Sequence, residues 1–406
     1  MEGMLPPAAA HSTTRTAAVV FAGFCAFLTL FAPQPLLPML AREFRVSAAA
    51  ISLVVSVSTL AVAMAAPFAG VVADRFGRKR VIVPAAFLLA VPTLLGATAT
   101  SYGQLLFWRF LQGVFTPGIF AVVIAYINEE WEAGAGAATA AYVTGTVLGG
   151  FTGRMVAALV ASHASWRWAF VTLGALNLLG AVAIRAWLPA GRRFTRTRRG
   201  PARGAMLRHL SNPRLVATYV VAFCVLFSML GTFTYVNFYL AAAPFSLSTA
   251  ALGLLFAVYL VGAAVTPTAG RAIDRFGHRV ALVAAFSGSA AGVCLTLVHS
   301  LPVVVAGLTL TCTGTFIANA AGSSYVGAAA TESRASAIGL YVTFYYLGGS
   351  GGSAIPGFFW ARGGWPACVG LIVAVQLLTI ALALIFWRPL PKVAGVPELT
   401  AAIEEG

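Results

Sequence analysis

The sequence has too little charge to cover a water-soluble protein. Asp, Glu, Lys and Arg make up only 9% of its 406 residues, whereas 60% are hydrophobic and the mean hydropathy is +0.89. A globular domain normally carries about 25% charged residues. A chain of this composition needs lipid as its solvent, with helices of about 20 apolar residues that each cross roughly 30 Å of hydrocarbon. The composition therefore predicts an integral membrane protein built of helices.

Cysteine and acidic residues are also scarce. The five cysteines are odd in number and scattered through apolar runs, which excludes a disulfide framework and a zinc site, so we expect buried free thiols and no metal or cofactor. None of the eleven acidic residues lies in the middle of an apolar run. No Walker motif is present, which argues against a pump driven by ATP.

Basic residues are plentiful and set the predicted topology. Twelve apolar segments begin near Ala17, Ile51, Val81, Gln104, Ala137, Trp166, Leu215, Ala250, Ala281, Pro302, Ala335 and Trp365. With the N-terminus inside, 20 of the 26 Lys and Arg residues are cytoplasmic and only Arg42, Arg45, Arg167 and Arg362 lie outside. Because cytoplasmic loops carry the excess of positive charge, both termini are predicted to be cytoplasmic.

The segments group into two sets of six. We predict a cytoplasmic tail over 1–16, a six-helix bundle over 17–188, a linker over 189–214, a second bundle over 215–388 and a tail over 389–406. The linker is basic and contains no acid. Such a segment could bind nucleic acid, but after six spans it indicates contact with anionic lipid headgroups instead. Membrane lipids are therefore expected partners, and nucleic acid is not.

The two sets repeat one another. Asp74–Gly77, after the second span, recurs as Asp274–Gly277, and residues 142–150 share six identities with residues 341–349 at a displacement of 199. Both copies occupy the same place in their half. This indicates a duplication that produced two parallel, pseudo-symmetric halves, one of the known plans of transporters.

Several motifs resemble those of the major facilitator superfamily. They are GxxxDRxGRK after the second span, LxxxRxxQG over Leu105–Gly113, GTVLGG over Gly145–Gly150, and PQPLLP over Pro33–Pro38. GTVLGG is similar to the GPxxGG motif of proton antiporters, with Thr146 in place of proline. The resemblance implies a bacterial inner-membrane permease, not an enzyme. It would act as a monomer and export a small molecule by alternating access and proton antiport.

The residues leave other functions open. An uptake symporter or facilitator of a neutral or anionic solute is the main alternative. Ser323 and Ser324 are the only tempting nucleophiles for an intramembrane enzyme, and no paired acid accompanies them. A receptor on the same fold would carry no solute flux.

The resemblance also implies a conformational latch in the loop after the second span. Asp74 would cap the N-terminus of span eleven, where a carboxylate meets unpaired N–H groups. Arg78 would pair with Glu129 or Glu130 at the end of span four, and both contacts would form only when the halves close on the cytoplasmic side. The other members of the predicted latch are Gly70, Arg75 and Gly77 in the first loop and Asp274, Arg275 and His278 in the second, with Glu332 as the partner of His278.

The second latch is expected to respond to pH, because histidine titrates near neutrality. Alternatively, both loops are only anchors that follow the positive-inside rule.

Two arginines lie inside apolar spans, where ionisable groups are costly and are candidates for function. Arg109 is predicted to serve substrate binding or coupling, or else to bond backbone carbonyls or Gln112. Arg154 could contribute to function or reach the membrane interface. With cations and no acid buried, a neutral or anionic substrate fits better than a cation.

Further residues are predicted to line the central cavity or to allow close helix packing. The full set of candidate lining residues is Gln34, Arg109, Gln112, Tyr235, Asn237, Tyr239, Asn319 and Tyr345. Each of them except Arg109 could equally form an interhelical hydrogen bond. The predicted packing glycines are Gly145, Gly149, Gly150 and Gly153, and the spacing of the first, second and fourth puts them on one helical face.

Overall fold

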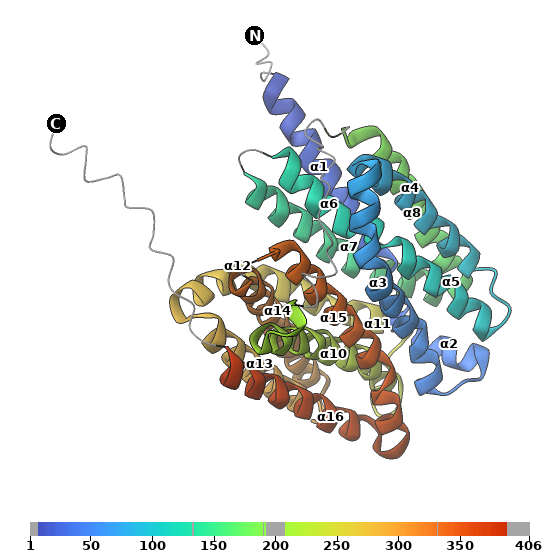
Figure 1. Ribbon diagram of the computed structural model, residues 1–406. Coiled ribbons are helices and arrows are strands. Elements are labelled where there is room, and N and C mark those ends of the chain that lie inside the picture. Colours follow the sequence, from blue (N-terminus) through green and yellow to red (C-terminus); the bar gives the residue numbers. More distant parts are fainter. Residues whose placement is uncertain (1–6, 132–133, 190, 192–207, 331, 388–406) are drawn as a thin grey trace, which may run out of the picture.

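The computed structural model describes residues 7–131, 134–189, 191, 208–330 and 332–387, and these residues form helices joined by short turns (Figure 1). The first half contains α1 (Pro7–Leu28), η1 (Gln34–Leu36), α2 (Leu37–Phe44), α3 (Ala48–Phe76), α4 (Arg78–Gly96), α5 (Tyr102–Phe115), α6 (Pro117–Glu130), α7 (Ala135–His163) and α8 (Trp166–Trp187). The second contains α10 (Pro213–Ala241), α11 (Thr249–Leu254), η2 (Leu255–Ala257), α12 (Val258–Phe276), α13 (His278–Leu295), α14 (Leu301–Ala329), α15 (Arg334–Ala354) and α16 (Pro356–Phe386).

Most of the predicted spans are long, apolar helices. Within the described ranges, nine helices can cross a membrane by length and composition, and a tenth span results if the bent pair Thr249–Val265 and Thr268–Phe276 is taken together. The other two predicted spans correspond to the shorter apolar helix Thr14–Leu28 and to α15, whose glycines, serines and tyrosines lower its hydropathy. Twelve spans and cytoplasmic termini remain predictions.

Two helix boundaries follow from proline and glycine. Span four is divided into α5 and α6 at Thr116, directly before Pro117, which has no N–H to continue the hydrogen-bond ladder. In α16 the backbone leaves the helical region at Gly363 and Gly364, the latter with φ +57°. The first turns of α16 therefore extend the span of α15, and the last span begins near Trp365, as the sequence predicts.

The sequence repeat is visible in the packing of the helices. A Cβ built on Gly149 or Gly153 of α7 would collide with the carbonyl oxygens of Phe24 and Leu28 in α1. The corresponding glycines of α15, Gly348 and Gly352, meet Phe223 and Phe227 of α10 in the same way. The two glycines of α7 and their two partners in α1 each lie 199 residues before their counterparts in α15 and α10. The α1–α7 and α10–α15 contacts are therefore two copies of one arrangement.

The cysteines are all free. Cys25, Cys224, Cys312 and Cys368 are buried, but Cys294 is exposed, so the prediction of buried thiols is wrong at that residue. Cys294 lies one residue before the end of α13.

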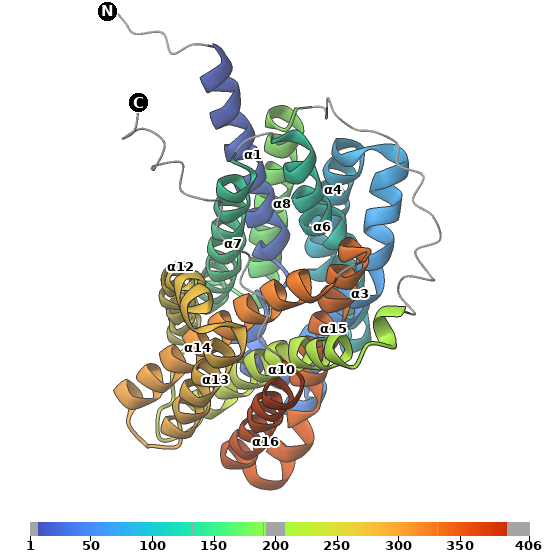
Figure 2. The same cartoon turned by 60° about the vertical axis from the view of Figure 1, so that its left-hand side comes forward.

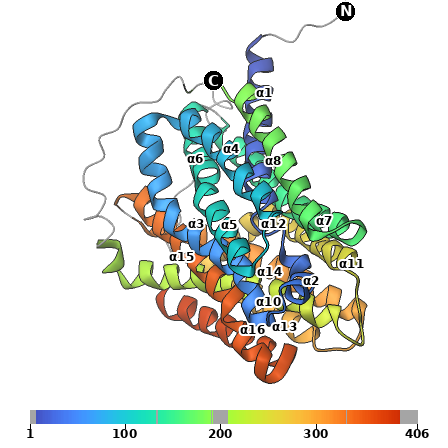
Figure 3. The ribbon, with the colours of Figure 1, turned by 90° about the vertical axis from the view of Figure 1, so that its right-hand side faces the viewer.

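The two halves form two bundles that meet at one end of the molecule. In Figure 2, α1, α3, α4, α6, α7 and α8 stand in the upper bundle, and α10, α13, α14 and α16 cross beneath them. Figure 3 shows α15 beside α3, the pair with the most extensive contact between the halves. A second contact joins α11 to α7. The seam between the bundles therefore runs along α3 and α15 on one side and along α7 and α11 on the other.

Candidate functional site

Among the described residues, the hydrogen bonds that join the halves lie at the end of α3 that is remote from the Asp74 loop. Ser52 and Ser56 in the first turns of α3 contact the second half: Tyr235 Oη lies 2.9 Å from Ser52 Oγ, and Ser56 Oγ donates to the carbonyl of Ser350 at 2.9 Å. Gln34 Nε2 donates to Thr234 Oγ1 at 3.3 Å. We call this end of the molecule, formed around Gln34, Ser52 and Tyr235, the sealed end.

The space around a Cβ added at individual glycines shows how closely the two halves approach each other. At the sealed end, a Cβ on Gly357 would lie 2.6 Å from Cβ of Ala49, and one on Gly253 would overlap Ala158. Toward the two DRxG loops, added Cβ atoms on Gly70 of α3 and Gly270 of α12 would meet nothing within 4 Å. The same holds for Gly136 at the start of α7 and Gly339 in α15. At these four glycines the described residues of the two halves make no close contact, so we call this end of the seam open, and the close approach predicted at Gly70 is absent in this conformation.

Arg154 crosses the seam at the sealed end. Its side chain is only 2% exposed, and its Nε donates to Gln34 Oε1 at 2.8 Å while one terminal nitrogen donates to the carbonyl of Gly150 at 2.8 Å. The guanidinium carbon lies 5.0 Å from the ring centre of Phe31, and 4.7 Å from those of Phe256 and Tyr259. Two of these rings belong to the second half. The Arg154 side chain therefore does not reach the membrane–water interface, which was the alternative to a functional role in the sequence analysis.

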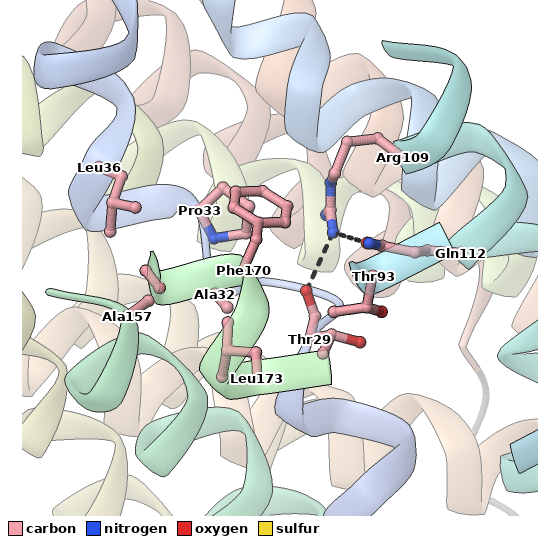
Figure 4. Close-up of a pocket in the computed structure, with 11 residues that line it drawn as sticks. Thr29, Ala32, Pro33, Leu36, Thr93, Arg109, Gln112, Ala157, Phe170 and Leu173 are labelled. Atoms are coloured by element: carbon pink, nitrogen blue, oxygen red, sulfur yellow. Dashed lines mark hydrogen bonds between the residues drawn. The ribbon is translucent and has the colours of Figure 1, made fainter. Parts of the chain in front are cut away.

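Arg109 is buried within the first half and is held by backbone carbonyls. Its Nε donates to Val54 O at 3.0 Å, and one terminal nitrogen donates to Leu30 O. The other terminal nitrogen donates to Thr29 O at 3.0 Å and to Gln112 Oε1 (Figure 4). Thr29 and Leu30 follow the last residue of α1, where carbonyls lack helical partners and the macrodipole is negative. In this conformation the Arg109 guanidinium caps the C-terminal end of α1.

A small cavity adjoins Arg109. It has a volume of about 10 Å³, which is room for about one water molecule, and it lies inside the first half. Its lining residues include Pro33, Thr93, Phe170 and Leu173. The cavity is too small for an organic solute.

The other predicted lining residues divide into separate groups. Gln34 and Tyr235 lie at the seam with Arg154, whereas Gln112 is turned into the first half, where its Nε2 donates to Pro92 O at 3.3 Å. In the second half, Asn319 accepts a hydrogen bond from Tyr341 at 3.1 Å, and Tyr345 stacks on Tyr341. Asn237 donates to Phe233 O at 2.6 Å within its own helix, and Tyr239 stacks on Trp365 at 5.8 Å.

The first DRxG loop contains a compact ion-pair cluster. Arg78 Nε donates to Glu129 Oε2 at 3.0 Å, and Arg78 Nη2 lies 2.7 Å from Asp74 Oδ1. Gly77 joins α3 to α4 with φ +94°, a conformation that favours glycine. Glu130 is buried beside Gly191, at the end of span six, and not beside Arg78.

This cluster corrects the predicted latch in one respect. Arg78 and Glu129 both belong to the first half and pair while the loop end is open, so the prediction that they pair only on closure is wrong. The contact of Asp74 with span eleven stays a prediction for a conformation closed at this end. Arg75 lies over the ring of Phe76 at 5.5 Å, and Arg275 over Phe276 at 5.2 Å, so the loops are alike here.

The second DRxG loop differs at the histidine. His278 Nε2 lies 3.0 Å from Ser324 Oγ, and its ring packs edge-on against Tyr325. Glu332 instead faces Arg208 at 3.7 Å, and both side chains are exposed. The predicted pairing of His278 with Glu332 is therefore wrong, because His278 lies against Ser324 within α14, whereas Glu332 follows the end of that helix at Ala329 and pairs with Arg208. Asp274 lies in the same loop as His278.

An outer groove lies at the sealed end, between α2 and the start of α11. Its volume is about 540 Å³, and both halves line it, with Arg42, Glu43 and Arg45 from the first and Ser248 and Thr249 from the second. Glu43 Oε1 accepts a hydrogen bond from Arg167 at 3.0 Å. Because Glu43 is paired with Arg167, the remaining charges in the lining of the groove are those of Arg42 and Arg45, and the groove is positive.

Comparison with known proteins identifies the family of this two-bundle fold. The sequence signature of the Major Facilitator Superfamily matches residues 19–258 and 221–403. The chain belongs to this superfamily. It is 32% identical to the MFS-type transporter YybF of Bacillus subtilis, over 91% of the chain and 92% of that protein. It is also 32% identical to the inner membrane transport protein YnfM of Escherichia coli, over 89% of the chain and 88% of that protein.

Solved structures of other superfamily members share the fold. A mutant of the nucleoside transporter NupG superposes with a TM-score of 0.75 at 15% identity, covering 92% of the chain and all of that protein. A bacterial homologue of the human lysosomal transporter Spinster, in an inward-facing and occupied conformation, gives 0.74 at 16% identity, covering 95% and 98%. The family match and the two relatives show that this chain is a multi-pass transporter of the inner (plasma) membrane and not an enzyme. The predicted family and location are confirmed.

Sequence reasoning misses several residues of the seam, among them Ser52, Ser56, Thr234 and Arg154. Arg154 falls outside the predicted lining set because its position near the end of span five allows it to reach the interface. The signal that could have placed it is the pairing of a buried cation with Gln34, but the 120 residues between them hide that contact.

Proposed function

We propose that this protein is a secondary active transporter that exports a small neutral or anionic organic solute by proton antiport, as a monomer of twelve spans. The observation that carries the proposal is the asymmetric seam: the halves are in contact at Gly253 and Gly357 and apart at Gly70 and Gly270. A seam sealed at one end and open at the other is what alternating access requires. With the basic loops placed in the cytoplasm, the conformation is open to the inside.

The charges near the seam support a neutral or anionic solute. Arg109 and Arg154 are buried in the first half, and the described acids all lie at the ends of the spans. A cationic drug would meet positive charge and no carboxylate. Export is favoured by the resemblance of Gly145–Gly150 to the antiporter motif, and it remains the proposed direction.

A flux experiment tests transport and coupling separately. Purified protein in liposomes is loaded with an unlabelled solute, and counterflow of the labelled solute is measured with and without a pH gradient. Exchange in either condition supports alternating access, acceleration of solute movement opposite to the proton flow supports proton antiport, and acceleration of movement with the proton flow would favour the symporter. Exchange that is indifferent to the gradient would exclude antiport and favour the facilitator, the alternative function, whereas no exchange of any solute would contradict transport.

A further inference from the structure

Arg154 has hydrogen-bond capacity that the protein does not use. A guanidinium carries five N–H donors. The described residues supply acceptors for two of them, the side chain of Gln34 and the carbonyl of Gly150. Arg109, in contrast, has four acceptors, three of them backbone carbonyls. The two buried arginines therefore differ: Arg109 is satisfied by the fold, whereas Arg154 has donors available for a ligand.

The charge of Arg154 is also uncompensated by the described residues. None of the ion pairs among them includes Arg154. Its neighbours Phe31, Phe256 and Tyr259 attract a cation through their ring faces, but they remain neutral. Buried charges in membrane proteins normally pair with an opposite charge or line a pathway. An anion is the group that this site lacks.

Tyr259 offers a second donor at the same place. Its ring centre is 4.7 Å from the guanidinium carbon of Arg154, and its hydroxyl is buried without a hydrogen-bond partner among the described residues. A buried hydroxyl in this state costs free energy unless a ligand uses it. Arg154 and Tyr259 come from different halves, so a ligand held by both would bridge the seam.

The outer groove lies on the path by which such an anion would approach Arg154 from outside the sealed end. Beyond Gln34, the chain runs through η1 into α2, which brings Arg42 and Arg45 to the outer groove. If the halves rock apart at the sealed end, Phe256 and Tyr259 would move with the second half while Arg154 would stay with Gln34 in the first, so Tyr259 would hold a ligand together with Arg154 only once the halves close over it. While the halves are apart, the guanidinium would face the positively charged groove.

We propose that Arg154, with Gln34 and Tyr259, binds the carboxylate of an organic acid that this transporter carries. This inference rests on the proposed transport function and specifies its substrate class. A carboxylate is preferred to a phosphate monoester because one guanidinium balances one negative charge, whereas a phosphate monoester carries about −1.5 to −2. In this conformation the aromatic rings of Phe256 and Tyr259 lie over the guanidinium.

The test is a thermal-shift experiment on the purified full-length protein. The probes are benzoate, nicotinate and hexanoate, each compared with its neutral amide, with benzylammonium as the cation. We expect at least one acid to raise Tm in a dose-dependent way while its amide does not. The proposal is overturned if no acid exceeds its amide or if benzylammonium gives the larger shift.

Variants locate the binding site. Arg154→Met should abolish the acid-specific shift, and Tyr259→Phe should weaken the affinity about tenfold, the value of one hydrogen bond to a charged group. Gln34→Glu places a carboxylate beside Arg154 and should remove the shift without lowering Tm in the absence of acid, so it decides the question if Arg154→Met does not fold. Arg362→Gln is the matched control, since Arg362 is exposed and bonds only Phe358 O in its own helix among the described residues. Retention of the shift in Gln34→Glu and in any folded Arg154→Met overturns the proposal.

Counterflow of the same acid separates this inference from the proposed function. Binding that depends on Arg154 without any flux would contradict transport but leave the anion site intact. Flux of a cation or neutral solute that is unaffected by Arg154→Met would contradict the anion site and leave transport intact.

Discussion

Gly253 of α11 packs directly on Ala158 of α7, so closely that a Cβ at Gly253 would overlap the methyl group of Ala158. The contact joins the two halves where the seam is sealed. We expect Gly253→Val to force this end apart and favour the conformation closed at the loop end. Overpacking of this kind costs about 1–3 kcal/mol, which corresponds to a change of about 5–150-fold in the ratio of the two states.

Spin labels at Arg80→Cys and Arg279→Cys, in a cysteine-free background, measure this shift. The distance between them should shorten in Gly253→Val and stay long in Gly70→Val, because a side chain at Gly70 has space here but hinders closure of the loop end. Gly370→Ala, where an added Cβ meets nothing within 4 Å, is the control. Equal distance distributions in all three variants would contradict the rocking of the halves about this seam.

Arg109 should be essential for folding. Lysine cannot reach Val54 O, Thr29 O and Leu30 O together, because its ammonium lacks the planar fork of arginine. Arg109→Lys would leave buried carbonyls unpaired, at about 1–3 kcal/mol each. We expect a large fall in Tm and loss of the monodisperse peak in size-exclusion chromatography, which Arg362→Lys should not cause. A normally folded Arg109→Lys protein would show that these hydrogen bonds are dispensable.

The Arg78–Glu129 pair should stabilise the first half in every conformation. Arg78 is 8% exposed and Glu129 30%, so the pair is partly shielded from solvent. Arg78→Gln and Glu129→Gln should each destabilise the protein by about 1.5–3 kcal/mol, the range for hydrogen bonds to charged groups. The double variant Arg78→Gln/Glu129→Gln should lose less than the sum, measured as Tm in a double-mutant cycle. Additive losses would mean that the two residues act independently.

The Glu43–Arg167 pair at the outer groove should matter little for stability. The hydrogen bond from Arg167 lowers the pKa of Glu43 from its usual value, but both side chains are largely exposed. The pair therefore stabilises the fold above the ordinary pKa of a glutamate, and this contribution is lost as the pH falls through the lowered pKa. For an exposed pair we expect about 0.2–1 kcal/mol at neutral pH.

Thermal unfolding of Arg167→Gln at two salt concentrations measures this contribution. The difference from the unmodified protein should shrink at high salt and vanish below the lowered pKa of Glu43. A large loss of Tm that persists at acid pH would assign Arg167 a role other than this pair, such as its hydrogen bond to Ala99 O at 3.3 Å.

Features that depend on local pattern can be predicted from the sequence. The apolar runs and the placement of the basic residues predict helices of the right length, and the DRxG repeat predicts two homologous halves. The glycine face of Gly145, Gly149 and Gly153 is equally local, since a spacing of four residues puts side chains on one side of a helix. The partner helix α1 follows only from the tertiary structure.

Contacts between distant segments cannot be predicted in this way. The sequence predicts that His278 meets Glu332, but the length of α14 places Ser324 opposite it instead. Arg109 and Arg154 look alike in the sequence, as single cations in apolar runs. Only the fold shows that the first meets the end of α1 and the second meets aromatic rings across the seam.

By itself, the sequence determined that this chain is a membrane protein of two related helical halves, because hydropathy and charge act on each segment independently of the others. The tertiary structure alone decided which end of the seam is sealed and which buried arginine has donors to spare. Those properties depend on how the halves pack together, and a rocking motion can change that packing without altering a single helix.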